Sequence, residues 1–225
     1  MITKRQVQDW NRNVWEQKNR AMYAKYRRNQ WPWFNDKLDP DIEECLVADG
    51  SDGLDILDIG ACSGSQGIEL ARRGHRVVGT EISETALEQA KSAATGATGL
   101  TISFLMDDIA ESRLVDDQFD LVVDRGCYQS ICSFNHEEFV ASVRRILRPG
   151  GLFLLKVMSS EERRFVTFDK VGDREVQMPF HFTVEQLQNL MSPHFAIEQI
   201  RDSFFYSSVL EEPARARLVI MRNSK

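Results

Sequence analysis

The chain has 225 residues, a formal net charge of −6 at pH 7, 42% hydrophobic residues and 28% charged residues. This length suits one domain with a modest addition, because single cores rarely grow beyond about 250 residues. No apolar run approaches the ~20 residues of a membrane span, so we expect a soluble protein without a membrane partner. The acidic balance argues against a nucleic-acid partner, since binding to phosphate backbones needs clustered Lys and Arg.

The amino-terminal sequence, MITKRQVQDWNRN, lacks the apolar core of a signal peptide. We therefore expect a cytoplasmic protein that keeps reduced thiols at Cys45, Cys62, Cys127 and Cys132. Cys127 and Cys132 are near neighbours, but a single C-x4-C spacing without a second pair is not typical of a metal site. No metal is expected.

A helix is predicted over residues 5–29, because no Gly or Pro interrupts them and aromatic and aliphatic residues recur at helical spacing. Pro32 ends this pattern, and a second short helix is expected over residues 41–48. Strands and helices then alternate. Strands are expected at 54–59, 76–81, 101–106, 119–124 and 152–158, and helices at 65–73, 84–94, 136–147 and 183–191. Helix starts are predicted at Asn135 and Thr183, and Gly74 supplies a helix end.

Repeated alternation of strands and helices predicts a parallel sheet with helices on both faces. The last strand-like segments, 196–205 and 215–221, have only a loop between them, so the sheet is expected to end in an antiparallel pair. The fold class is therefore α/β, a doubly wound, Rossmann-like and mostly parallel sheet of seven strands. Residues 1–50 are expected to form a helical cap on the binding domain at 51–225.

The segment 54–83 combines a strand, a turn of small residues, a helix and a second strand that ends at Glu81. In a doubly wound sheet, ligands bind beyond the carboxyl ends of the strands, where this turn lies. Gly60 and Gly64 permit close approach of a ligand to the backbone. Glu81 is placed to accept hydrogen bonds from both hydroxyls of a ribose. A dinucleotide site would carry G-x-G-x-x-G, and the middle glycine of that pattern is Cys62 here.

The run Asp58-Ile59-Gly60-Ala61-Cys62-Ser63-Gly64 resembles the first motif, D-x-G-x-G-x-G, of the class I S-adenosylmethionine-dependent methyltransferases, except at Cys62. The run Phe104-Leu105-Met106-Asp107-Asp108-Ile109 resembles their third-strand motif, whose acid holds the adenine amino group. Asp108 is favoured over Asp107 because it lies eleven residues before Phe119, a common family spacing. The resemblance extends to Arg148-Pro149-Gly150-Gly151 and to the closing strand pair.

Two segments, GHRVVGTEIS at 74–83 and VDRGCY at 123–128, resemble sequences of the small-molecule branch that includes thiopurine and tellurite-resistance methyltransferases. The resemblance implies S-adenosylmethionine as cofactor and S-adenosylhomocysteine as product. It implies an orienting role for Asp58 toward the methionyl amine, and contacts from Glu81 to the ribose and from Asp108 with Ile109 to the adenine. The full set of implied cofactor contacts is Asp58, Gly60, Ala61, Cys62, Gly64, Glu81, Ile82, Asp108, Ile109, Asp124, Arg125 and Trp33.

Two of these implied contacts have structural alternatives that stay open. Arg125 would contact the cofactor near its carboxylate or ribose, since a guanidinium matches a carboxylate in bidentate geometry. Arg125 can equally pair with Asp124 or another acid for structure alone. Trp33 and its aromatic neighbours can enclose the sulfonium by cation–π contact, or they can simply seat the N-terminal helix on the domain.

Methyl transfer from a sulfonium depends mainly on alignment and exclusion of water, so a dedicated base is optional. An alcohol or ammonium acceptor would gain from a base, whereas a thiolate needs none. Tyr128 and His181 are the candidate catalytic residues, ahead of Gln129 and His136. The long charged connection at 159–182 is expected to form one wall of the acceptor pocket.

We therefore expect a methyltransferase that transfers the methyl group of S-adenosylmethionine to an O, N or S atom of a small molecule by in-line displacement. Three alternatives stay open: an NAD-dependent oxidoreductase, a methyltransferase-like protein that binds the cofactor without catalysis, and a methyltransferase that acts on a protein or peptide. The oligomeric state is not predicted.

Overall fold

The computed structural model describes residues 4–25, 30–50, 52–171 and 173–225. Its helices are α1 (Lys4–Lys25), α2 (Pro40–Asp49), α3 (Ser65–Arg72), α4 (Glu84–Thr95), α5 (Cys132–Ile146) and α6 (Val184–Met191), with single turns η2 (Ile109–Glu111) and η3 (Tyr128–Ser130). Its strands are β1 (Asp55–Ile59), β2 (Arg76–Glu81), β3 (Ile102–Met106), β4 (Phe119–Arg125), β5 (Leu147–Met158), β6 (Phe168–Val171), β7 (Arg174–Gln177), β8 (Ala196–Phe205) and β9 (Ala214–Arg222). None of the helices in the described residues is long and apolar enough to cross a membrane.

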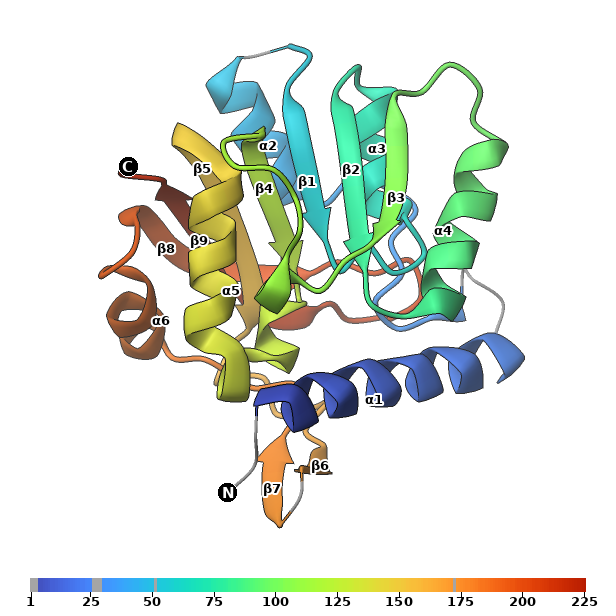
Figure 1. Ribbon diagram of the computed structural model, residues 1–225, viewed down its shortest axis with the longest axis vertical. Helices are drawn as coiled ribbons and strands as arrows, with labels where there is room; N and C mark the ends of the chain where they lie inside the picture. The colour runs from blue at the N-terminus through green and yellow to red at the C-terminus, as the bar shows by residue number, and fades with distance from the viewer. Residues whose placement is uncertain (1–3, 26–29, 51, 172) are drawn as a thin grey trace.

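The central sheet has seven strands in the order β3-β2-β1-β4-β5-β9-β8 (Figure 1). Strands β1 to β5 are mutually parallel, and β9 runs antiparallel to both of its neighbours, β5 and β8. The predicted doubly wound sheet with a closing antiparallel pair is confirmed. Strand order reverses between β1 and β4, and such a switch point is where this architecture opens a crevice for a ligand.

Successive strand residues supply two cores, one on each face of the sheet. Leu57 and Phe153 face the core that α5 and α6 cover, whereas Ile56 and Leu154 face the core that α2 and α3 cover. This alternation is the period of two expected for strands. Because both faces are buried, the central strands are apolar along their length, as parallel strands usually are.

Local signals in the sequence explain most helix boundaries. Thr183 and Gln186 form the predicted capping box, with Gln186 N donating to Thr183 Oγ1 at 3.1 Å and Thr183 N donating to Gln186 Oε1 at 2.9 Å. Gly74, with φ of +89°, follows the end of α3 as expected. The helix predicted from residue 136 instead begins at Cys132, and Asn135 marks a kink inside it with non-helical backbone angles.

Helix α1 lies across the carboxyl ends of the strands (Figure 1). Its Glu16 accepts hydrogen bonds from Ser83 Oγ at 2.6 Å and from Thr85 N and Oγ1 at 3.2 and 2.6 Å, at the start of α4. Burial alone would raise the pKa of Glu16, but these hydrogen bonds and one from Arg20 Nε lower it to about 2. Lys18 pairs with Asp169 of β6 at 2.6 Å. Two separate parts of the chain therefore hold α1 over the sheet edge, and the predicted residues 26–29 of this helix lie outside the described part.

The connection between β5 and α6 contains a structure that its charged sequence did not predict. Strands β6 and β7 pair antiparallel, from Phe168 opposite Gln177 to Val171 opposite Arg174. This hairpin projects beyond the sheet edge on the same side as α1 (Figure 1). The division of the chain into a cap and a binding domain at residue 50 stays a prediction.

Candidate cofactor and acceptor site

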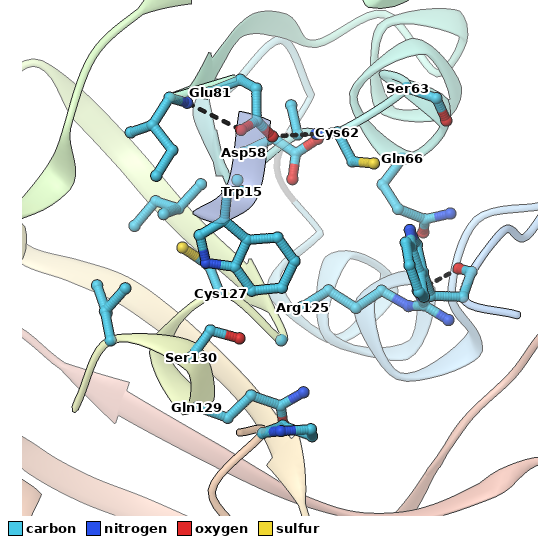
Figure 2. Close-up of a pocket in the computed structure, with 18 of the residues that line it drawn as sticks. Trp15, Asp58, Cys62, Ser63, Gln66, Glu81, Arg125, Cys127, Gln129 and Ser130 are labelled. Atoms are coloured by element: carbon cyan, nitrogen blue, oxygen red, sulfur yellow. Dashed lines mark hydrogen bonds between the residues drawn. The ribbon is translucent and has the colours of Figure 1, made fainter. Parts of the chain in front are cut away.

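A cavity of about 320 Å³ lies between the carboxyl ends of the strands and α1 (Figure 2). Its size is that of a typical small-molecule site. The residues at the ends of β1, β2 and β3 give it an acidic half, formed by Asp58, Glu81, Asp107 and Asp108. The residues at and beyond the ends of β5 and β8 give it an apolar half, formed by Met158, Phe165, Phe205, Leu210 and Ala214.

The turn after β1 allows the cavity to reach the backbone. Gly60 has φ of +64°, and a Cβ at this position would lie 2.9 Å from Cys127 Cβ, so only glycine fits. Cys62 also adopts a left-handed conformation, with φ of 49°, although it is not glycine. The residue that departs from the motif therefore adopts a backbone region that favours glycine, at a strain of roughly 1–2 kcal/mol. Gly64 does not line the cavity, and its role is to pack against Phe104.

Glu81 is fixed at the end of β2 by three backbone amides. Cys62 N donates to Oε2 at 2.9 Å, while Ile82 N and Ser83 N donate to Oε1 at 2.8 and 3.0 Å. Burial raises the pKa of Glu81, and the three amides counteract part of this effect. The carboxylate thus joins the turn after β1 to the end of β2 and forms part of the cavity wall with Cys62 and Ile82.

Unpaired acceptor atoms gather on the acidic half. Asp58 lines the cavity, its Oδ2 is buried without a hydrogen-bond partner, and burial raises its pKa to about 7. Asp107 Oδ2 and Asn11 Oδ1, on two further residues of the wall, are also buried without a partner. Asp108 accepts from Ala110 N at 3.0 Å and lines the cavity together with Ile109. Buried acceptors without partners are costly, so this half suits a ligand that presents N–H and O–H donors.

Asp124 and Arg125, which the sequence assigned to the cofactor, make other contacts. Asp124 lies outside the cavity wall and accepts hydrogen bonds from the amides of residues 126, 127 and 128 at 2.8–2.9 Å, so its carboxylate shapes the turn after β4. Arg125 lines the cavity, but its Nε donates to Asp39 at 2.9 Å and its Nη1 donates to Trp33 O at 3.1 Å. These contacts fasten the N-terminal segment to the sheet, and a contact of Arg125 with the cofactor stays a prediction.

Helix α1 contributes a face whose residues were not among the predicted cofactor contacts. Asn11, Trp15 and Asn19, spaced by four residues, all line the cavity. Side chains at this spacing share one face of a helix, which is the signal available in the sequence. Figure 2 shows the Trp15 ring between Glu81 at one end of the cavity and Ser130 at the other. Trp33 also belongs to the wall, as predicted.

Comparison with known proteins identifies the family. A family model described as a methyltransferase domain matches residues 56–151. An uncharacterized methyltransferase of Schizosaccharomyces pombe is 30% identical, over 52% of this chain and 81% of that protein. The chain belongs to the class I S-adenosylmethionine-dependent methyltransferases. A 2-heptyl-1-hydroxyquinolin-4(1H)-one methyltransferase of Mycobacteroides abscessus is 24% identical, over 79% of this chain and 74% of that protein.

Solved structures share the fold of this methyltransferase. The 1,6-didemethyltoxoflavin-N1-methyltransferase of Burkholderia thailandensis, solved with 1,6-didemethyltoxoflavin and S-adenosylhomocysteine, superposes with a TM-score of 0.70 at 17% identity. The match covers 100% of this chain and 92% of that one. Because the chain belongs to the methyltransferase family, we drop the hypothesis of an NAD-dependent oxidoreductase.

The acidic half fits S-adenosylmethionine, the cofactor of this family. The cofactor carries an ammonium group, two ribose hydroxyls and an adenine amine, all of which donate hydrogen bonds. The unpaired oxygens of Asp58, Asp107 and Asn11 are acceptors of that kind. The sulfonium cation likewise suits a wall that carries carboxylates and the Trp15 ring.

The structure places Tyr128 outside the wall of this cavity, and a catalytic role for it stays a prediction. Its ring is fully buried, its hydroxyl lies 2.7 Å from His136 Nδ1, and it stacks on Phe182 in the core. The reason is its place on η3, which turns the ring toward α5 while the next residue, Gln129, lines the cavity. His181 also lies outside the wall, with its Nδ1 3.1 Å from the carbonyl oxygen of Glu162.

Proposed function

We propose that this methyltransferase methylates a small apolar molecule, with S-adenosylmethionine as the methyl donor. The observation that carries the proposal is the division of one cavity into an acidic half and an apolar half under a single cover, α1. A ligand rich in hydrogen-bond donors and a largely apolar molecule can then lie side by side in it. Such a shared enclosure supplies alignment and excludes water, the main requirements of an in-line displacement.

In this proposal the cofactor contacts follow the geometry of the acidic half. Asp58 holds the ammonium group of the methionyl end, Glu81 accepts from the ribose hydroxyls, and Asp108 accepts from the adenine amine. Bound S-adenosylmethionine supplies a methyl group activated by the sulfonium. Trp15 covers the middle of the cavity and, with Trp33, restricts the access of water.

Two comparisons support a small-molecule acceptor. The names of the Mycobacteroides abscessus relative and of the Burkholderia thailandensis enzyme both specify heterocyclic small molecules. The cavity of about 320 Å³ also falls within the range of small-molecule sites. Phe165 and Pro179 of the connection 159–182 line this cavity, which supports the proposal that the connection forms one wall of the acceptor pocket.

Calorimetric titration with S-adenosylmethionine tests the cofactor assignment. We expect Glu81→Gln to weaken binding by about 10- to 100-fold, because hydrogen bonds to a charged group contribute about 1.5–3 kcal/mol. Glu84→Gln, the same charge change at an exposed position three residues away, is the matched control and should leave the affinity unchanged. Circular dichroism of both variants verifies that they fold.

The outcomes separate the parts of the proposal. Unchanged affinity in folded Glu81→Gln would refute the ribose contact. Absence of binding by the unaltered protein would overturn the proposed function. Tight binding without turnover on thiols, amines, phenols and carboxylic acids would support the alternative of a methyltransferase-like binding protein without catalysis.

A further inference from the structure

The apolar half of the cavity carries no group that can act as a general base among the described residues. Its wall is built from Met158, Phe165, Phe205, Leu210 and Ala214, and it continues through the turn after β4. The carboxylates of the wall all lie at the ends of β1, β2 and β3, in the acidic half. The turn after β4 adds these lining residues: Arg125, Gly126, Cys127, Gln129, Ser130 and Ile131.

None of those turn residues takes a proton readily. Arg125 carries a guanidinium, which has N–H donors and no acceptor. Cys127 carries a thiol, and its burial raises its pKa well above the usual value. Ser130 and Gln129 have no basic group near neutral pH. An acceptor bound here therefore receives no help from a general base in this part of the wall.

Gln129 offers the cavity a hydrogen-bond donor whose orientation is fixed. Its Oε1 accepts from the backbone N–H of Met158 at 2.6 Å, and its own backbone oxygen accepts from Phe180 N at 2.8 Å. Since a backbone N–H can bond only to the amide oxygen, Nε2 is the atom left over for a ligand. The side chain is 8% exposed and lines the cavity, next to Ser130 in Figure 2.

We propose, on the basis of the function proposed above, that the acceptor is an apolar ring compound whose own hydroxyl or thiol is acidic enough to ionise near neutral pH. Gln129 Nε2 donates to this anion or to a carbonyl conjugated with it. The apolar half, with Phe165 and Phe205 in its wall, packs against the ring. Ser130 is a further polar side chain in this part of the wall.

The transfer then needs no proton acceptor from the protein. The proton leaves the acceptor for solvent before binding. The oxygen or sulfur anion supplies the electron pair of the new bond to the methyl carbon. The bond from that carbon to the sulfonium sulfur breaks, and its electron pair stays on sulfur. A neutral methyl ether or thioether and S-adenosylhomocysteine are the products, and the charges balance.

Rate profiles against pH test this proposal with para-substituted phenols and thiophenols of graded pKa, at a concentration of S-adenosylmethionine that saturates the protein at every pH, so that titration of Asp58 does not enter the profile. We expect kcat/KM for each acceptor to rise with pH and to level off near the pKa of that acceptor, so that the inflection moves as the substituent changes. An inflection that stays at one pH for all acceptors would reveal a base on the enzyme and overturn the proposal.

Gln129→Glu tests the donor. The new carboxylate still accepts from Met158 N, but it removes the donor and adds a negative charge beside the anion. We expect kcat/KM to fall at least about tenfold, with the affinity for S-adenosylmethionine unchanged. Gln199→Glu, the same change on the exposed surface of β8, is the matched control. An unaltered kcat/KM in Gln129→Glu would overturn the assignment of this donor.

The two proposals fail in different ways. If S-adenosylmethionine binds and amines or carboxylic acids are methylated while every phenol and thiophenol is inert, the acceptor class inferred here is wrong and the methyltransferase function stands. If S-adenosylmethionine does not bind, the proposed function itself is overturned.

Discussion

Gly64 provides the sharpest test of how the turn after β1 is built. It precedes α3, has φ of +76°, and lies under the ring of Phe104. A Cβ added there would meet Phe104 Cζ at 2.6 Å and Ala90 Cβ at 3.1 Å. Gly64→Ala therefore imposes two costs, a strained backbone and an overlap in a closed core.

The expected loss of stability in Gly64→Ala follows from these two costs. A left-handed conformation costs a residue with a Cβ roughly 1–2 kcal/mol. Overpacking typically adds about 1–3 kcal/mol, and Phe104 has little room to move because it is 4% exposed. Replacing glycine also restricts the unfolded chain, which returns about 0.4–1 kcal/mol. We expect Gly64→Ala to lower the free energy of unfolding by about 2–4 kcal/mol.

Gly74→Ala is the matched control for chemical denaturation. Gly74 follows the end of the same helix with φ of +89°, but a Cβ there meets nothing within 4 Å. In this variant only the left-handed backbone is unfavourable, so we expect the free energy of unfolding to fall by about 1 kcal/mol. Equal losses in the two variants would refute the overlap with Phe104 as the reason for Gly64.

Three further results are expected. Glu16→Gln weakens the bond between α1 and Thr85 and should lower the free energy of unfolding by about 1–2 kcal/mol at pH 7, measured by denaturation. Because the pKa of Glu16 is lowered to about 2, this contribution is complete above its unfolded pKa of 4.5 and is lost as the pH falls from there toward 2. Lys156→Met leaves the fully buried Asp39 without one of its cations and should cost about 3–5 kcal/mol in the same assay. Burial raises the pKa of Asp58 to about 7, and an ammonium ligand requires the carboxylate, so the Kd for S-adenosylmethionine should weaken by up to about tenfold per pH unit below pH 7.

Each of these results has a control. Glu88→Gln, an exposed change on α4, should leave stability unchanged, and an equal loss would contradict the contact of Glu16. Retention of full stability by Lys156→Met would show that the pair with Asp39 contributes nothing. Asp58→Asn should abolish the pH dependence of binding, and a Kd independent of pH in the unaltered protein would refute the role of Asp58.

Prediction from sequence succeeded where local chemistry marks an element. The strand expected at 196–205 coincides with β8, and the expected capping box opens α6 at Thr183. It failed for β6 and β7, whose charged sequences lack an apolar alternation, because each strand is defined mainly by its pairing with the other. Helix α5 was predicted to start after Asn135. It begins at Cys132 instead, and Asn135 forms a kink inside the helix.

The sequence by itself determined the acidic half of the site. Asp58, Glu81 and Asp108 are read from their places at or just beyond the ends of strands, and parallel strands bring those ends to one edge.

Only the tertiary structure decided which side chains outside the motifs face the cavity. A turn sequence does not specify which way its residues point, so Tyr128 turned into the core and Gln129 into the cavity. The cover over the cavity depends on contacts such as Glu16 with Ser83, which are 67 residues apart. Contacts of that separation form only when the whole chain packs, and they place Trp15 over the site.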